Sequence, residues 1–359
     1  MSRLFEPLTL RELTLRNRIA MSPMCTYSCE ARDGQASDWH LQHLASRAAG
    51  GLGLVLSEAV AVAAGGRISP EDLGLYDDEQ VAPLRRIAKA VRAEGAAFGV
   101  QLAHAGRKAG CFRPWDPRRG VVAGADGGWP DDVIGPTAAP FGDANATPRA
   151  LDGDGIASVV RAFAAAAARA DAASADVLEI HAAHGYLLHT FLSPLTNARD
   201  DGYGGDERDR ARLLHEVVDA VRTTWPEEKP LFVRLSATDW VAGGWDVDAT
   251  VRLSRSLADR GVDLIDCSAG GAVPGVQIDA HPNYQVAFAE RVRREAGVAS
   301  GAVGAIADPL QAEAIVAEGR ADLVLLGKAL LRQPYWPIAA AKALGAAPPW
   351  PRQYAWAVG

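Results

Sequence analysis

Two histidines and a tyrosine stand at the end of a short apolar run in the segment DVLEIHAAHGYL, residues 176–187. His181 and His184 are three residues apart, and Tyr186 follows two residues later. Two imidazole N–H groups can stabilise negative charge that develops on a carbonyl oxygen, and a phenol can donate a proton. The same pair could instead ligate a metal or fill a core. A metal site needs a third and usually a fourth ligand, and the sequence signals none near the pair.

A lone arginine interrupts another apolar run, PLFVRLSA at 230–237. In a strand, period-two alternation places Phe232, Arg234 and Ser236 on one face. A guanidinium that faces a buried interior is costly unless an anion lies nearby. Two interpretations stay open: an ion pair with an inward acid such as Glu179, or a cation beside the electron-rich end of a redox cofactor.

Two glycine segments near the end of the chain have the composition of an anion site. SGAVGAI (300–306) and LLGKAL (325–330) each place glycine after an apolar run, and Lys328 follows Gly327 directly. Glycine exposes backbone N–H groups, and α/β barrels often bind phosphate through their last two loops. Together with the lysine, the two segments favour phosphate binding over simple tight turns.

Eight apolar runs alternate with helical patterns along the chain. The expected strands lie within 19–24, 52–60, 97–106, 176–183, 230–237, 262–270, 298–304 and 321–327, and helices are expected at 81–95, 156–173, 210–225 and 251–261. Parallel strands that are buried on both faces have continuous apolar sequences, so the pattern predicts an α/β fold, a single (β/α)₈ TIM barrel over residues 1–359. An open doubly wound sheet is the alternative, but no GxGxxG follows the first strand.

Two further segments are expected around this barrel. Alternation on both sides of Arg11-Glu12 predicts an N-terminal hairpin within residues 1–18, which would close the bottom of the barrel. Residues 107–153 are rich in Gly, Pro, Asp and Trp and show no clear periodicity. Because so long a connection inside a domain is usually functional, we expect a capping loop after the third strand.

Composition excludes several classes of function. The chain has 359 residues, of which 48% are hydrophobic and 23% charged, as in ordinary globular proteins. The formal net charge of −7 lacks the basic footprint of nucleic-acid binding. Four cysteines without a CxxC pair make neither a disulfide framework nor an iron–sulfur site. No apolar run has the length of a membrane span and no secretory signal is present, so a cytoplasmic protein with small-molecule partners is expected.

Five segments, taken in order, resemble blocks of the old yellow enzyme family of FMN-dependent ene-reductases. They are MSPMCTY (21–27), QLAHAGRK (101–108), EIHAAHGYLLHTFLSPLTN (179–197), RDDGYGG (199–205) and FVRLSA (232–237). The resemblance runs over nearly the whole chain. The cysteine in MSPMCTY and the HAAH form of the histidine pair are similar to the thermophilic-like subgroup, which resembles YqjM and xenobiotic reductase A.

The resemblance implies that FMN lies across the mouth of the barrel. Gln101 would hydrogen-bond the pyrimidine edge of the flavin, and Arg234 would sit near N1 and O2, where a reduced flavin carries negative charge. The glycine segments and Lys328 would hold the phosphate. The implied cofactor-binding residues are Pro23, Met24, Cys25, Ala59, Gln101, Arg234, Gly304, Gly327 and Lys328.

The resemblance also implies the reaction, reduction of the C=C bond of enones, enals and related maleimides or nitroalkenes. His181 and His184 would bind the carbonyl oxygen, flavin N5 would deliver a hydride to the β-carbon, and Tyr186 would protonate the α-carbon. NADPH or NADH would reduce the flavin in an earlier half-reaction. The implied substrate-binding residues are Tyr27, Lys108 and Trp356.

The chain departs from the family pattern at three places. Lys328 stands where many relatives carry arginine, which predicts weaker phosphate binding because lysine lacks the bidentate fork. Asp206 and Asp209 replace a serine and an asparagine after DGYGG. In the tail, residues 346–359, Trp356 stands about where some relatives send an arginine into the active site of a neighbouring subunit. Relatives in this subgroup are usually dimers or tetramers, so the resemblance implies a homodimer or homotetramer, with this tail near an active site or a subunit interface.

Other classes of protein remain as alternatives. A dienoyl-CoA reductase would need a cysteine cluster and a further domain, and the acidic charge opposes a tRNA-reducing flavin barrel. A metal-dependent hydrolase or aldolase barrel would use His181 and His184 as ligands. A non-enzymatic binding protein would leave Arg234, Gln101 and the histidine pair without a joint purpose.

Overall fold

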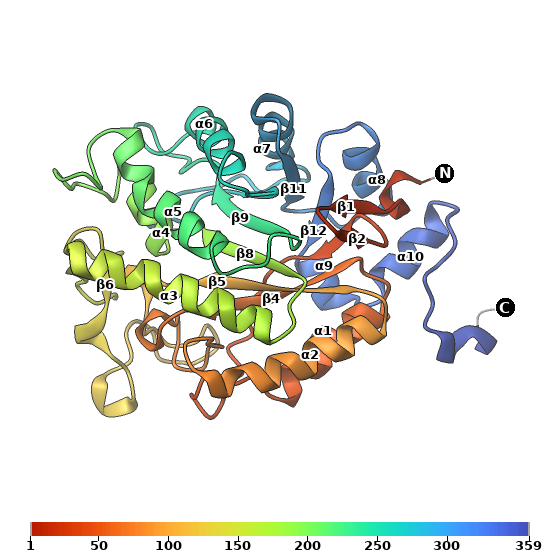
Figure 1. Ribbon diagram of the computed structural model, residues 1–359, viewed down its shortest axis with the longest axis horizontal. Helices are drawn as coiled ribbons and strands as arrows, with labels where there is room; N and C mark the ends of the chain where they lie inside the picture. The colour runs from red at the N-terminus through yellow and green to blue at the C-terminus, as the bar shows by residue number, and fades with distance from the viewer. Residues whose placement is uncertain (1, 358–359) are drawn as a thin grey trace.

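A closed barrel of eight parallel strands forms the centre of the molecule in the computed structural model, which describes residues 2–357 (Figure 1). The strands are β3 (Ile19–Met21), β4 (Leu54–Ala61), β5 (Ala97–Ala103), β8 (Val177–Ala182), β9 (Leu231–Ser236), β10 (Leu264–Ser268), β11 (Ala299–Val303) and β12 (Leu323–Leu326). They follow one another in chain order, and β12 pairs with β3 to close the barrel. Each strand overlaps a predicted apolar run, so the (β/α)₈ prediction is confirmed.

Helices surround the strands and bury their apolar faces against the outer side of the barrel. The four predicted helices are present as α2 (Val81–Ala93), α3 (Gly153–Ala172), α5 (Glu207–Arg222) and α6 (Val247–Ala258). The others are α1 (Asp38–Ala49), α4 (Leu187–Leu192), α7 (Val286–Arg291), α8 (Pro309–Ala317), α9 (Lys328–Arg332) and α10 (Trp336–Ala343). Across residues 2–357 no helix is both long and apolar enough to span a membrane.

The start of α5 resolves one departure from the family pattern. Asp206 is the N-cap residue, and its carboxylate accepts the backbone N–H of Asp209 at 2.9 Å. Aspartate caps helices about as well as serine or asparagine. The local turn after DGYGG is therefore preserved by a different side chain.

The predicted N-terminal hairpin is also confirmed. β1 (Leu8–Leu10) and β2 (Leu13–Leu15) pair antiparallel, with Arg11 at the turn in the left-handed region at φ +51°. Leu8 and Leu15 pack with Phe232 and Leu264, which point into the barrel. Figure 1 shows the hairpin at the end of the barrel opposite the segment that contains β6 (Ile134–Gly135), so the hairpin closes the bottom of the barrel.

Alternation along the strands separates an apolar lower layer from a polar upper layer inside the barrel. Phe232 packs in the lower layer, and Arg234, two residues further along β9, enters the upper layer. Strand register places Arg234 beside His181 of β8 on one side and Asp266 of β10 on the other. The polar side chains therefore meet at the carboxyl ends of the strands, where barrel enzymes carry their active sites.

Residues 107–153 lie over this carboxyl end and contain two short parallel strands, β6 (Ile134–Gly135) and β7 (Arg149–Ala150). Side chains rather than regular structure fix the segment in place. The indole N–H of Trp129 donates to the carbonyl of Gly65 at 3.0 Å, and Arg107 donates to the carbonyl of Ala272 at 2.5 Å. These contacts explain why the sequence of the segment shows no periodicity.

Candidate active site

A cavity of about 220 Å³ opens at the carboxyl end of the barrel. Nine residues that sequence analysis singled out line it together, although they come from loops and strands spread over more than 200 positions. They are Pro23, Cys25, Tyr27, Ala59, Gln101, His181, His184, Tyr186 and Arg234. The prediction that these side chains share one site agrees with this geometry.

The two histidines converge on one point. His181 Nε2 lies 3.3 Å from His184 Nδ1, and the two rings are nearly perpendicular, at 79°. The ring of Tyr186 lies 4.9 Å from that of His181, also edge-on. An oxygen atom in the cavity at about 2.9 Å from both nitrogens would face two potential donors, with the phenol beside it.

The backbone around His184 is held in a costly conformation. His184 has φ +59°, in the left-handed region, which costs a non-glycine residue about 1–2 kcal/mol. Its N–H donates to Ser236 Oγ at 2.9 Å, and its carbonyl accepts from Lys108 Nζ at 2.7 Å. Lys108 also donates to the carbonyl of Gly271 at 2.8 Å. The ammonium of Lys108 thus holds the backbone of the turn at His184 in place and does not line the cavity.

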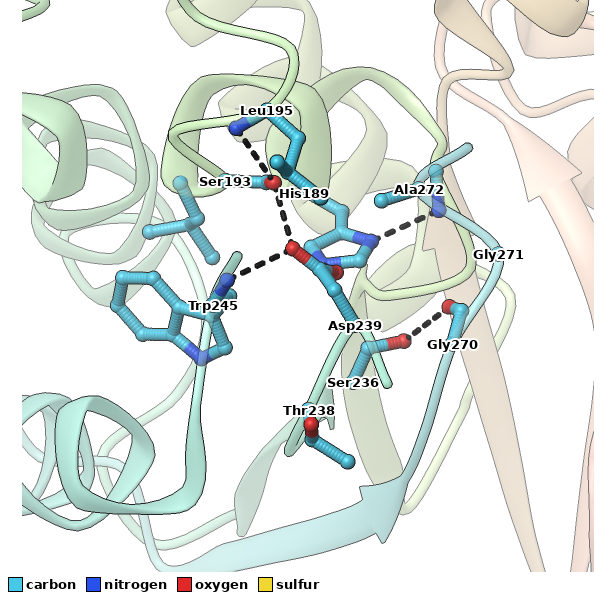
Figure 2. Close-up of polar contacts among 12 residues, drawn as sticks. His189, Ser193, Leu195, Ser236, Thr238, Asp239, Trp245, Gly270, Gly271 and Ala272 are labelled. Carbon is cyan, nitrogen blue, oxygen red and sulfur yellow. Dashed lines mark hydrogen bonds and ion pairs between the residues drawn. The ribbon is translucent and has the colours of Figure 1, made fainter. Parts of the chain in front are cut away.

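A buried histidine–aspartate pair supports the same turn, and Figure 2 shows it between α4 and the loop after β9. The N–H of Gly185 donates to His189 Nδ1 at 2.8 Å, and His189 Nε2 lies 3.1 Å from Asp239 Oδ1. Asp239 Oδ2 also accepts from Ser193 Oγ at 2.6 Å and from the backbone of Trp245 at 2.8 Å. Sequence analysis missed this network, because neither residue ends a strand.

Burial sets the charge of the catalytic candidates. Loss of hydration, followed by the positive charge of Arg234, holds the pKa values of His181 and His184 well below the usual range of histidine. Both rings are therefore neutral at pH 7, and each carries one proton. Burial also raises the pKa of Tyr186 well above that of a free phenol, so this residue is a proton donor rather than a base.

These pKa directions predict that the contribution of the histidine pair to turnover does not change between pH 6 and pH 8. Both imidazoles stay neutral in this window, because burial holds their pKa values well below the value of about 6.5 of free histidine. The measurement is the ratio of kcat/KM for wild type to that for a His181→Ala/His184→Ala variant at each pH. A tenfold change of this ratio across the window would show that an imidazolium takes part.

The buried arginine has an anionic partner, but not the one suggested by the sequence. Arg234 Nε lies 3.2 Å from Asp266 Oδ2, on the neighbouring strand. Glu179 instead accepts the amide N–H of Gln101 at 2.7 Å. The suggestion of Glu179 was wrong because it sits one layer lower, opposite Phe232 in the strand register. Alternation within VDLIDCSAG, 262–270, could have identified Asp266.

The wall that carries Cys25 and Tyr27 is fixed by a buried acid. Thr26, between them, donates its backbone N–H and its hydroxyl to Glu58 Oε2 at 3.1 and 2.5 Å. Burial raises the pKa of Glu58 to about 8 and that of the Cys25 thiol well above its usual range. Cys25 is therefore a neutral thiol at pH 7, suited to packing against a ligand rather than to nucleophilic attack.

Five other predicted residues lie outside the cavity lining. Met24 approaches Gly327, where an added Cβ would be 3.5 Å from its sulfur, and Lys328 is exposed directly after that glycine. Gly304 has φ +109°, and an added Cβ would lie 2.5 Å from Gln285 Nε2. Trp356 is 88% exposed in the tail, which Figure 1 places beyond α10, at the same end of the barrel as the hairpin. A role for Trp356 in the site of a second copy stays a prediction, and residues 358–359 of this tail lie outside the described residues.

The geometry gives no support to the metal-ligand interpretation of the histidine pair. The nearest partners of His184 are Ser236, Ser268 and His181. Among the described residues no group of three or more His, Cys, Asp or Glu side chains is arranged to hold a metal ion. A hydrolase or aldolase that uses zinc would need such a group.

Comparisons with known proteins agree with this geometry. The model of the NADH:flavin oxidoreductase / NADH oxidase family matches residues 3–346. An NADPH dehydrogenase of Geobacillus sp. (strain WCH70) is 49% identical over 342 residues, which cover 95% of this chain and 94% of that protein. The solved structure of the old yellow enzyme homologue from Zymomonas mobilis has a TM-score of 0.79 at 26% identity, over 96% of this chain and 93% of that chain.

A solved 2-naphthoyl-CoA reductase has a TM-score of 0.86 at 25% identity. The match covers 96% of this chain and 52% of that chain, so the chain spans about half the length of this relative.

Proposed function

Because this chain is an FMN-dependent NADPH dehydrogenase that belongs to the NADH:flavin oxidoreductase / NADH oxidase family, we propose that it reduces the C=C bond of α,β-unsaturated carbonyl compounds. Its structural relatives include an old yellow enzyme homologue. The observation that carries the proposal is the convergence of His181 Nε2 and His184 Nδ1, 3.3 Å apart, in a cavity that Tyr186 also lines. A carbonyl oxygen is the group that two neutral imidazole donors would bind.

The residues around the cavity fit FMN. Arg234 Nε lies 3.2 Å from Asp266 Oδ2 without a hydrogen bond, and no hydrogen bond from the two terminal nitrogens of Arg234 is found among residues 2–357. A guanidinium that offers these nitrogens to a cavity suits the N1 and O2 edge of a flavin, where negative charge develops on reduction. Gly304 and Gly327 follow β11 and β12 directly, and barrels often bind phosphate through the loops after their last two strands. Lys328 would supply the positive charge.

When bound, FMN supplies the hydride for the β-carbon of the substrate. The chain itself orients the substrate and moves the proton. His181 and His184 draw electron density from the alkene through the carbonyl oxygen. Tyr186, which stays protonated because burial raises its pKa, donates its phenolic proton to the α-carbon.

The experiment that tests this proposal is product analysis with NADPH and 2-cyclohexen-1-one. The expected product is cyclohexanone, formed in equal amount to the NADPH consumed. Formation of cyclohexenol would instead mean that the carbonyl group, and not the alkene, accepts the hydride.

The capping loop, residues 107–153, provides a prediction about substrate affinity. Trp115 of residues 107–153 is 58% exposed, and its ring lies edge-on to Tyr27 at 5.6 Å, at the cavity wall. We expect Trp115→Ala to raise KM for enones about fivefold, through loss of one aromatic contact of about 1 kcal/mol, with unchanged flavin content. Trp39→Ala is the matched control, since Trp39 is 51% exposed and stacks on His43 of the same helix. Loss of flavin in the Trp115 variant would place the cap in the cofactor site instead.

A further inference from the structure

Ser268 ends β10 with its side chain inside the barrel, and only 5% of the residue is exposed. Its hydroxyl oxygen lies 2.7 Å from His184 Nε2. Across the described residues this is the one hydrogen-bond contact of that hydroxyl. Ser268 therefore meets the edge of the imidazole that faces away from His181.

The proton of His181 can be placed from the backbone. The N–H of Ala183 donates to His181 Nδ1 at 3.2 Å, so this nitrogen is an acceptor. Because the ring is neutral, its proton lies on Nε2, 3.3 Å from His184 Nδ1, so His184 Nδ1 accepts this hydrogen bond in the structure. His181 is thus fixed as a donor into the cavity by its own chain.

His184 is also neutral, so in this arrangement its proton lies on Nε2 and is donated to the hydroxyl oxygen of Ser268. For both rings to donate to one carbonyl oxygen, His184 must carry its proton on Nδ1, and its Nε2 must accept a hydrogen bond. The hydroxyl of Ser268 is the group in position to donate that bond.

We propose that Ser268 is a positioning residue: in the substrate complex its hydroxyl, which can accept or donate, donates to His184 Nε2 and so stabilises the tautomer whose Nδ1–H faces the substrate oxygen. The inference rests on the proposed function of the histidine pair. It extends that function by assigning the tautomer of each ring and the side chain that selects it. Without the hydroxyl, the ring loses its anchor and its two tautomers compete.

The first test compares Ser268→Ala with wild type in the flavin-loaded protein. We expect binding of 4-chlorophenol, followed by its long-wavelength absorbance with the flavin, to weaken about five- to tenfold, the equivalent of one lost hydrogen bond. The kcat/KM for 2-cyclohexen-1-one is expected to fall by a similar factor. The matched control is Ser256→Ala, which removes the hydroxyl 2.8 Å from His215 Nε2 between α5 and α6.

A second measurement reads the tautomer directly. In ¹⁵N-histidine spectra of the phenol complex, wild type is expected to show His184 protonated on Nδ1, and Ser268→Ala a mixture of tautomers. If Ser268→Ala disturbs the fold or the flavin content, the variants Ser268→Thr and Ser268→Val test the role of the hydroxyl instead. The two side chains have nearly the same shape, and only threonine keeps the hydroxyl. The expected result is that threonine retains phenol binding and valine does not.

The outcomes separate this inference from the proposed function. The role of Ser268 would be overturned, and the proposed function kept, if wild type reduces the enone and Ser268→Ala binds 4-chlorophenol and reduces the enone within twofold of wild type. Equal binding by the threonine and valine variants would do the same. Wild type that fails to reduce the enone would overturn the proposed function itself.

Discussion

Replacing both His181 and His184 by alanine is expected to lower kcat/KM for 2-cyclohexen-1-one by at least 10²-fold, while flavin binding is retained. Loss of one preorganised donor to a developing oxyanion typically costs about 10²- to 10³-fold. The two rings lie 3.3 Å apart, and among the described residues neither ring hydrogen-bonds to Gln101 or Arg234. The double variant therefore removes both donors and leaves the cofactor contacts.

This prediction is checked by steady-state kinetics and by the flavin absorbance of the purified variant. His215→Ala is a matched control, because His215 also contacts a serine but lies between α5 and α6, away from the cavity. Affinity for 4-chlorophenol should be lost with the enone activity. Enone turnover within threefold of wild type in the double variant would exclude the role of carbonyl donor.

Tyr186→Phe is expected to slow oxidation of the reduced enzyme by the enone about 10²- to 10³-fold, within the usual range for removal of a general acid. Reduction by NADPH should stay near the wild-type rate, because no phenolic proton is needed in that half-reaction. The pKa of Tyr186 lies well above 10, owing to burial and then to the nearby Cys25. The wild-type rate should therefore show no alkaline loss from Tyr186 up to pH 9.

Rapid-mixing absorbance measurements separate the two half-reactions for this variant. Tyr203→Phe is a suitable control, since it also removes a phenolic hydroxyl, one that donates to Glu216 at 3.0 Å on α5. If Tyr186→Phe is oxidised by the enone as fast as wild type, the proton comes from solvent or from another side chain.

Patterns within single segments predicted most of this molecule. Continuous apolar runs revealed the eight strands because both faces of each strand are buried. The rule that barrel enzymes carry catalytic groups at strand ends then placed His181, Gln101 and Arg234 at one level. The same rule placed Cys25 just after the first strand, and the resemblance to a known family added Tyr27, which lies outside every expected helix and strand.

Contacts between neighbouring segments could not be predicted in this way. The partner of Arg234 depends on strand register, which decides between Glu179 and Asp266. The pair of His189 and Asp239 forms only because α4 and the loop after β9 meet beneath the histidine turn. Single-sequence periodicity contains no information about such register and loop geometry.

The most direct test of the account is the visible spectrum of the purified protein under anaerobic conditions, with NADPH added first and 2-cyclohexen-1-one second. The account predicts a flavin band that bleaches with NADPH and returns with the enone in stoichiometric amount. A band that bleaches but returns only when oxygen is admitted would contradict the proposed reduction of unsaturated carbonyl compounds.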